Sequence, residues 1–229
     1  MRFVTILCCI ILLQYCTPPL QLISYHKRAD DIYINTRLKQ FVKENPSPKI
    51  VLRVLSTGDN GMSSTATNYN WIYTTIEKVL LKEGFVVRDR TLFNAVVDKN
   101  RGSDYATIRN NTDTDIIMEI LKIDTAVLYT TDTVLLAYHK KQRKDVQQMH
   151  YQALGATIEY RLIMMKQNDI TAGLSYYYAP CVDGCEAYSF TNAKNNAKKP
   201  VLKKIVPAER LSSFVEHTVA DMTRQLRSQ

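Results

Sequence analysis

The spacing of apolar residues changes along the chain, and each change predicts a structural element. Residues 31–44 carry apolar side chains at the spacing of a short amphipathic helix, which the following Asn-Pro-Ser-Pro segment ends. Residues 49–55 form an apolar run that is typical of a buried strand. Adjacent apolar pairs recur every four residues over 70–83, which predicts a helix, and Gly84 follows as its stop signal.

Further along the chain the apolar period shortens to two, which predicts long strands. Ile158, Tyr160, Leu162 and Met164, for example, are expected to share one face of a strand. The remaining expected elements are a strand over 85–89, a helix over 91–99, a helical turn over 103–109, strands over 115–123, 125–138, 151–166 and 170–179, and a helix over 207–226. This order predicts an α/β (α+β) fold in a single domain: a mixed sheet with flanking helices, a C-terminal β-meander and a final helix.

The segment STGDNGMSSTATNYN, residues 56–70, stands where nucleotide-binding folds place a phosphate loop, between a buried strand and a helix. A phosphate loop needs converging glycines and a lysine at the start of the helix. Here Gly58 and Gly61 are followed by no such lysine, and Gly61 is far from the helix start. We therefore predict a polar connection that caps the helix, and no bound cofactor.

The N-terminus has the pattern of an export signal. Arg2 precedes an apolar stretch over 3–13, which is too short to span a bilayer and has the length of a signal-peptide core. Cys16 lies just beyond this stretch, where bacterial lipoproteins are cleaved and lipidated; cleavage as an ordinary secretory signal a few residues later is the alternative. We expect a signal peptide over 1–16, a tether over 17–30 and one domain over 31–229.

The net charge of +8 would suit an anionic partner such as nucleic acid. The basic residues are spread thinly, however, and the two densest runs lie within 140–144 and 194–204. Neither run contains aromatic residues spaced for base stacking. We therefore predict solvated loops at both places and no nucleic-acid partner.

Two cysteines remain beyond the signal, Cys181 and Cys185, within the sequence PCVDGC. The Asp-Gly pair between them favours a turn, and in an oxidising compartment a disulfide that closes this turn is the natural pairing. A metal site would need further ligands. The four histidines are scattered without the spacing of metal ligands, so we predict no metal site.

The sequence contains no recognisable catalytic constellation. Ser56, Ser63 and Ser64 lack the G-x-S-x-G turn of a serine nucleophile, and no histidine is spaced to act as its base. Asp89, Asp113 and Asp115 could suggest carboxylate chemistry, but each lies beside a strand end, where capping and turn roles are common. We therefore expect a protein with no enzymatic activity.

The segment IEKVLLKEGFVVRDRTLFNAV over 76–96, followed by TDIIMEI over 114–120, carries a family resemblance. It resembles the periplasmic domain of the curli secretion channel lipoprotein family and its relatives, which include lipoproteins that activate penicillin-binding proteins. In these families a helix ends in glycine, the next strand ends in V-x-D-R, and an Ala-Asp or Thr-Asp pair opens a later strand. The resemblance implies a lipid-anchored envelope protein whose α/β domain binds other proteins and has no catalytic residues.

These expectations combine into one functional hypothesis. The chain is expected to be a non-enzymatic scaffold or regulator of envelope assembly, with envelope proteins as partners. It would lie in the periplasm, anchored to the outer membrane of a diderm bacterium if Cys16 is lipidated. The first alternative is an oligomeric outer-membrane secretion channel subunit, and the second is an exported enzyme that acts on an anionic envelope polymer.

Overall fold

The computed structural model describes residues 21–53, 70–99, 105–131, 133–136, 141–144, 151–186 and 206–228. The predicted signal peptide with Cys16, the connection over 56–70 except for Asn70, and the basic run over 194–204 lie outside these residues. Contacts group the chain into a larger unit (27–127, 154–179 and 204–229) and a smaller unit (1–26, 128–153 and 180–203). The predicted domain bounds, 31–229, stay a prediction.

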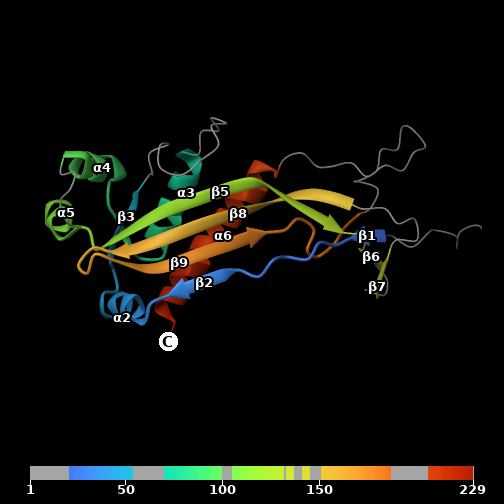
Figure 1. Ribbon diagram of the computed structural model, residues 1–229, viewed down its shortest axis with the longest axis horizontal. Helices are drawn as coiled ribbons and strands as arrows, with labels where there is room; N and C mark the ends of the chain where they lie inside the picture. The colour runs from blue at the N-terminus through green and yellow to red at the C-terminus, as the bar shows by residue number, and fades with distance from the viewer. Residues whose placement is uncertain are drawn as a thin grey trace, which may run out of the picture. The chain divides into compact units, whose positions relative to one another are not determined.

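The larger unit has the predicted mixed α/β architecture, built on a six-stranded sheet (Figure 1). In spatial order its strands are β2 (Asp31–Ile34), β9 (Asp169–Tyr178), β8 (Tyr151–Met164), β5 (Ile116–Thr131), β3 (Lys49–Arg53) and β4 (Val86–Val87). Strand β9 pairs antiparallel with β2 and β8, whereas β3 pairs parallel with β5 and β4.

The helices of this unit are α2 (Thr36–Glu44), α3 (Asn70–Lys82), α4 (Arg90–Lys99), α5 (Tyr105–Thr112) and α6 (Ala208–Arg227). The predicted helices over 70–83, 91–99 and 207–226 are thus confirmed as α3, α4 and α6. Asp89 starts α4, because its carboxylate accepts hydrogen bonds from the N–H groups of Thr91 and Leu92, both at 2.8 Å. Within the described residues, no helix is both long and apolar enough to cross a membrane.

The prediction of a helix over 31–44 is wrong in its first part. Residues 31–34 form β2, whose Ile32 and Ile34 contact the main core. The helix begins only after Asn35, whose side chain accepts a hydrogen bond from the N–H of Arg37 at 2.9 Å. These residues pair with β9, which is distant in sequence, and this pairing overrides the helical spacing of their apolar side chains.

The main core lies between one face of the sheet and helices α2, α3 and α6. Figure 1 shows α3 and α6 behind strands β5, β8 and β9. Two tyrosines of the sheet reach polar groups of α6: the hydroxyls of Tyr160 and Thr218 lie 2.9 Å apart, and Tyr176 donates to Asp221 Oδ2 at 3.3 Å. Burial raises the pKa of both tyrosines, and the Asp221 carboxylate raises that of Tyr176 further.

A smaller core lies on the opposite face of the sheet, under α4 and α5. Phe93 of α4 and Ile108 of α5 pack there against Val51, Ile117 and Ile163 of the sheet. Figure 1 shows these two helices at one end of the sheet. They therefore cover one end of this face.

The smaller unit contains a four-stranded antiparallel sheet. Its strands, in spatial order, are β10 (Cys185–Glu186), β1 (Gln21–Ile23), β6 (Thr133–Leu136) and β7 (Lys141–Lys144). Strand β1 lies inside the 17–30 segment that was expected to be a tether. Ile23, Tyr25, Tyr151 and Ala153 form a buried cluster in this unit, and burial raises the pKa of Tyr25 to about 12.

Candidate functional site on the open sheet face

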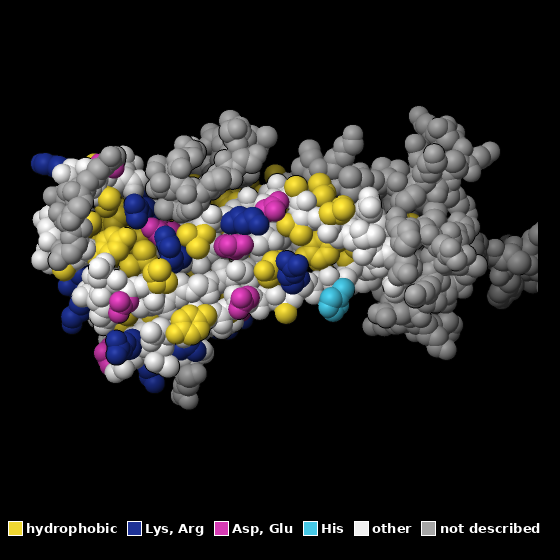
Figure 2. Space-filling model, in the orientation of Figure 1, with side chains coloured by type: hydrophobic (Ala, Val, Ile, Leu, Met, Phe, Trp, Pro, Cys, Tyr) yellow, Lys and Arg dark blue, Asp and Glu magenta, His cyan; other side chains and the backbone are white. Residues whose placement is uncertain are grey.

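The sheet face opposite α2, α3 and α6 is covered at one end by α4 and α5. Beyond that end, side chains of β2, β9, β8, β5 and β3 form a surface that no other described element covers. We call this surface the open face. Figure 2 views the molecule from this side and shows basic, acidic and hydrophobic side chains interspersed over its centre. The open face is therefore neither a uniformly charged nor a uniformly apolar surface.

Strand register aligns five residues across the open face, and we call them the central row. They are Tyr33 of β2, Gly173 of β9, Arg161 of β8, Glu119 of β5 and Arg53 of β3. Tyr33 lies opposite Gly173, which lies opposite Arg161, and Glu119 is the register partner of Arg53. An ion pair between Arg161 and Glu119 joins the two halves of the row.

Glu119 is the buried centre of the central row. Its side chain has no exposed surface, whereas those of Arg53 and Arg161 are 30% and 32% exposed. Arg53 Nη1 donates to Glu119 Oε1 at 2.9 Å, and Arg161 Nε donates to Oε2 at 2.7 Å. Each carboxylate oxygen therefore has a cationic partner, as a buried carboxylate requires. Two positive charges against one negative charge give the three residues a net charge of +1.

Gly173 leaves a gap in the central row, although neither sterics nor backbone conformation requires a glycine there. A Cβ atom added there would meet no described atom within 4 Å, and the residue does not have the positive φ that favours glycine. The ring of Tyr33 therefore does not cover Gly173, and Tyr33 is itself 65% exposed. A glycine inside a strand often marks a place where a ligand or another backbone approaches closely.

An aliphatic side chain lies on the same face. Ile170 of β9 is the register partner of Ile163, whose side chain packs in the core under α4 and α5. Ile170 is 61% exposed. The open face thus combines an exposed aromatic ring, an exposed aliphatic side chain and two half-buried arginines, and protein interfaces are enriched in tyrosine and arginine.

Sequence reasoning missed the central row. Glu119 could have indicated it, because it is a single charged residue within the apolar run IIMEIL. A carboxylate in a buried strand needs a partner, so the sequence predicts a basic residue nearby in the fold. Its partners, Arg53 and Arg161, are separated from it by 66 and 42 residues. Only the strand register brings the three together.

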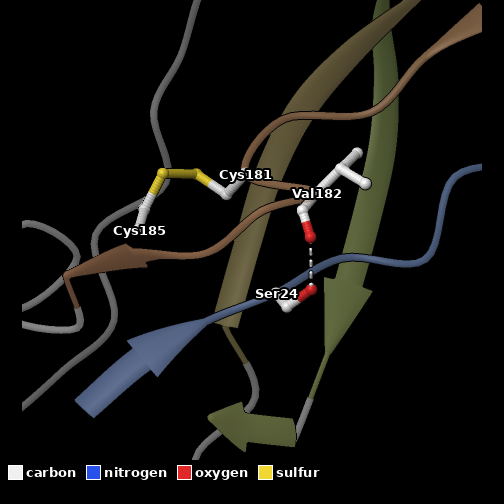
Figure 3. Close-up of a disulfide and its surroundings, with 4 residues drawn as sticks. All are labelled: Ser24, Cys181, Val182 and Cys185. Atoms are coloured by element: carbon white, nitrogen blue, oxygen red, sulfur yellow. Dashed lines mark hydrogen bonds between the residues drawn. A yellow bond between two sulfur atoms is a disulfide. The ribbon is translucent and has the colours of Figure 1, made fainter. Parts of the chain in front are cut away.

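The predicted cysteine pair lies in the smaller unit, where the structure joins Cys181 and Cys185 by a disulfide (Figure 3). Their Cα atoms are 5.2 Å apart. Gly184, with a φ of 97°, provides the left-handed conformation that the closed turn needs. Ser24 Oγ donates to the backbone oxygen of Val182 at 3.0 Å, so the turn is also tied to the segment that follows β1.

The acidic residues considered for catalysis have structural partners. Asp113 accepts hydrogen bonds from Lys49 Nζ at 2.6 Å and from Arg88. The hydrogen bond from Lys49 is the main cause that holds the pKa of Asp113 below its usual value. Asp115 accepts a hydrogen bond from the N–H of Lys49 at 3.2 Å and pairs with Arg109 at 3.0 Å. These contacts fasten the starts of β3 and β5 to each other.

Other candidate sites are few in the part of the chain that the structure describes. No group of three or more His, Cys, Asp or Glu side chains is placed there to hold a metal ion. A depression of about 390 Å³ lies at the end of α6, lined by Glu83, Ala220, Arg224, Arg227 and Ser228. Arg227 donates there to the backbone oxygen of Glu83 at 2.5 Å, just after the last turn of α3. That arginine therefore stabilises a helix end.

Comparisons with known proteins give distant likenesses. No protein-family model and no curated protein sequence matches the chain. The PelC dodecamer from Paraburkholderia phytofirmans is 7% identical, with 88% of this chain and 98% of that chain covered and a TM-score of 0.39. A PDZ domain protein from Parabacteroides distasonis is 11% identical, with 96% of this chain and 39% of that chain covered and a TM-score of 0.37. Because both TM-scores are below 0.5, neither likeness supports an inference about this chain, and the family resemblance stays a prediction.

Proposed function

We propose that the chain is an exported cell-envelope protein that binds another protein through its open face and catalyses no reaction. The signal-peptide pattern over 1–16 supports export, and the Cys181–Cys185 disulfide fits an oxidising compartment. The proposal includes a periplasmic location and a lipid on Cys16 that holds the protein at the outer membrane of a diderm bacterium. The domain would then act near that membrane as a scaffold or regulator of envelope assembly.

The central row is the observation that carries this proposal. A buried carboxylate held by two arginines is seldom more stable than well-packed apolar residues of the same volume, so stability alone does not account for it. Departures from local sequence rules occur mainly at functional sites. Here the departure lies beside an exposed tyrosine and an uncovered glycine, on a face that helices cover only at one end among the described residues.

Substitution of Gly173 tests the proposed use of the open face. Gly173→Gln places a neutral side chain in the gap, and because its Cβ would meet no described atom within 4 Å, the fold should persist. Ser213→Gln is the matched control, because Ser213 is exposed on α6, which packs on the opposite face. Cells that express each tagged variant are treated with formaldehyde, and the protein adducts are purified and quantified.

We expect a discrete protein adduct with the wild type and with Ser213→Gln, and its loss with Gly173→Gln. Unchanged melting curves for the two variants would show that the loss is not caused by unfolding. An adduct that survives Gly173→Gln at the wild-type level would remove the open face from the proposal.

Lipidation of Cys16 is tested separately. Cells are labelled with palmitate, and label incorporated into the wild type should be absent from Cys16→Ala. Label that persists in Cys16→Ala would show that this residue does not carry the lipid, in which case the ordinary secretory signal is the better interpretation.

A further inference from the structure

The two arginines of the central row have hydrogen-bonding capacity that Glu119 does not use. A guanidinium carries five N–H donors. Arg161 directs Nε and Nη2 toward Glu119 Oε2, and Arg53 directs Nη1 toward Oε1. To the described residues, Arg161 Nη1 and Arg53 Nε and Nη2 make no hydrogen bond. With about a third of each side chain exposed, these donors can reach a group that approaches the open face.

The charge of the row defines what kind of group would be attracted. Glu119 neutralises one of the two arginines and leaves a charge of +1 on a partly desolvated surface. The acidic residues nearest along the strands, Glu159 of β8 and Asp31 of β2, stand two positions away from the row, at the register of Ser175. Within the row itself, the two guanidiniums share the single carboxylate of Glu119. A carboxylate is the protein group that complements two guanidiniums in charge and geometry.

We propose that Arg53 and Arg161 bind the carboxylate of an Asp or Glu side chain in a partner protein. Gly173 lets the backbone of that segment approach the sheet, and Tyr33 packs against an apolar residue next to the acidic one. Glu119 positions the two arginines and does not contact the partner. This proposal rests on the proposed function and specifies the chemistry of the partner.

Charge variants separate this role from a structural one. Glu119→Gln keeps an acceptor oxygen between the arginines and raises the charge of the row from +1 to +2. The triple variant Arg53→Gln, Glu119→Gln, Arg161→Gln removes all three charges and leaves no buried carboxylate without a partner. A structural role alone predicts that both variants act through stability, whereas the carboxylate proposal predicts that only the triple variant lowers binding.

The experiment places the photo-crosslinking residue p-benzoylphenylalanine at position 175 of the full chain, in place of Ser175, which lies next to the central row. Cells that express this protein, alone or with each charge variant, are irradiated. The adduct is quantified relative to the folded protein, and the captured peptide is identified by mass spectrometry. Melting curves of the purified variants provide the control for folding.

The expected result is an adduct that Glu119→Gln retains or increases and that the triple variant lowers by about tenfold or more. The captured peptide should contain Asp or Glu next to an apolar residue. If the triple variant gives the wild-type yield, the carboxylate proposal is wrong while the proposed use of the open face stands. If position 175 gives no adduct even without the charge variants, the proposed function itself fails. A captured peptide from this chain would mean a second copy and would overturn the proposal of a separate partner.

Discussion

Replacing buried Glu119 should lower the free energy of unfolding less than replacing its two partly exposed partners, Arg53 and Arg161. Glu119 has no exposed surface, whereas the arginine side chains are 30% and 32% exposed. In Glu119→Leu, the two guanidiniums can turn toward water, and a leucine of similar volume fills the apolar strand. In the double variant Arg53→Leu, Arg161→Leu, the carboxylate remains buried without a cationic partner.

The magnitudes follow from the burial of the charge that is left behind. Leaving a buried charge without its partner costs about 3–5 kcal/mol, so we expect that loss in the double arginine variant. Replacing buried charged residues by packed apolar ones is often neutral, so Glu119→Leu should cost about 1 kcal/mol or less. The two variants should therefore differ by about 2–4 kcal/mol in the free energy of unfolding.

Urea unfolding of the mature chain measures this difference. Trp71 is the single tryptophan and packs partly buried against the main core, so its fluorescence reports on the larger unit. Equal slopes of the unfolding curves are required for the comparison of midpoints. If Glu119→Leu destabilises the protein as much as the double variant or more, the account of a buried carboxylate held by two accessible arginines is wrong.

Three further variants test separate parts of the structure. Gly173→Thr should raise the free energy of unfolding by about 0.5–1 kcal/mol in urea titrations, because a strand glycine without steric need is replaced by a residue that favours strands; a loss would mean that the position is crowded. Cys181→Ser with Cys185→Ser should cost about 2 kcal/mol in the smaller unit, measured by hydrogen exchange of β1, since the closed loop is short; unchanged exchange would contradict this. Tyr160→Phe should cost about 1 kcal/mol at neutral pH, because one buried hydrogen bond to Thr218 is lost.

The same tyrosine gives the protein a dependence on alkaline pH. Burial raises the pKa of Tyr160 above its ordinary value of 10.0, so the unfolded state loses this proton at lower pH than the folded state. Its contribution is complete below pH 10 and is lost as the pH rises toward the folded-state pKa. Unfolding free energies measured from pH 9 upward should therefore fall less steeply in Tyr160→Phe than in the wild type; parallel curves would contradict this role.

Much of the fold could be predicted because several elements bury a stripe that is periodic in the sequence. Helix α3 buries Ile72, Ile76 and Leu80 at helical spacing, and α6 does the same along its length. Strand β2, by contrast, could not be separated from α2 in the sequence. Four residues are too few to show a period, and their strand conformation depends on pairing with β9.

The candidate site could not be assembled from the sequence for a related reason. Arg53, Glu119 and Arg161 lie on three strands with no local pattern in common, and a shift of one residue in register would move any of them to the opposite face. The role of Gly173 is also visible only in three dimensions. In the sequence, Gly173 looks like any other glycine within a strand. That no described atom lies within 4 Å of an added Cβ is seen only in the structure.

Site-specific photo-crosslinking from Ser175 tests most directly whether the open face binds a protein. Ser175 lies on the open face next to the central row, and Ser213 on α6 provides the control on the opposite side of the larger unit. Each position is replaced in turn by p-benzoylphenylalanine in living cells, and adducts are compared after irradiation. The account predicts a specific protein adduct from position 175 and none from position 213. No adduct from position 175, or the same adduct from both positions, would contradict it.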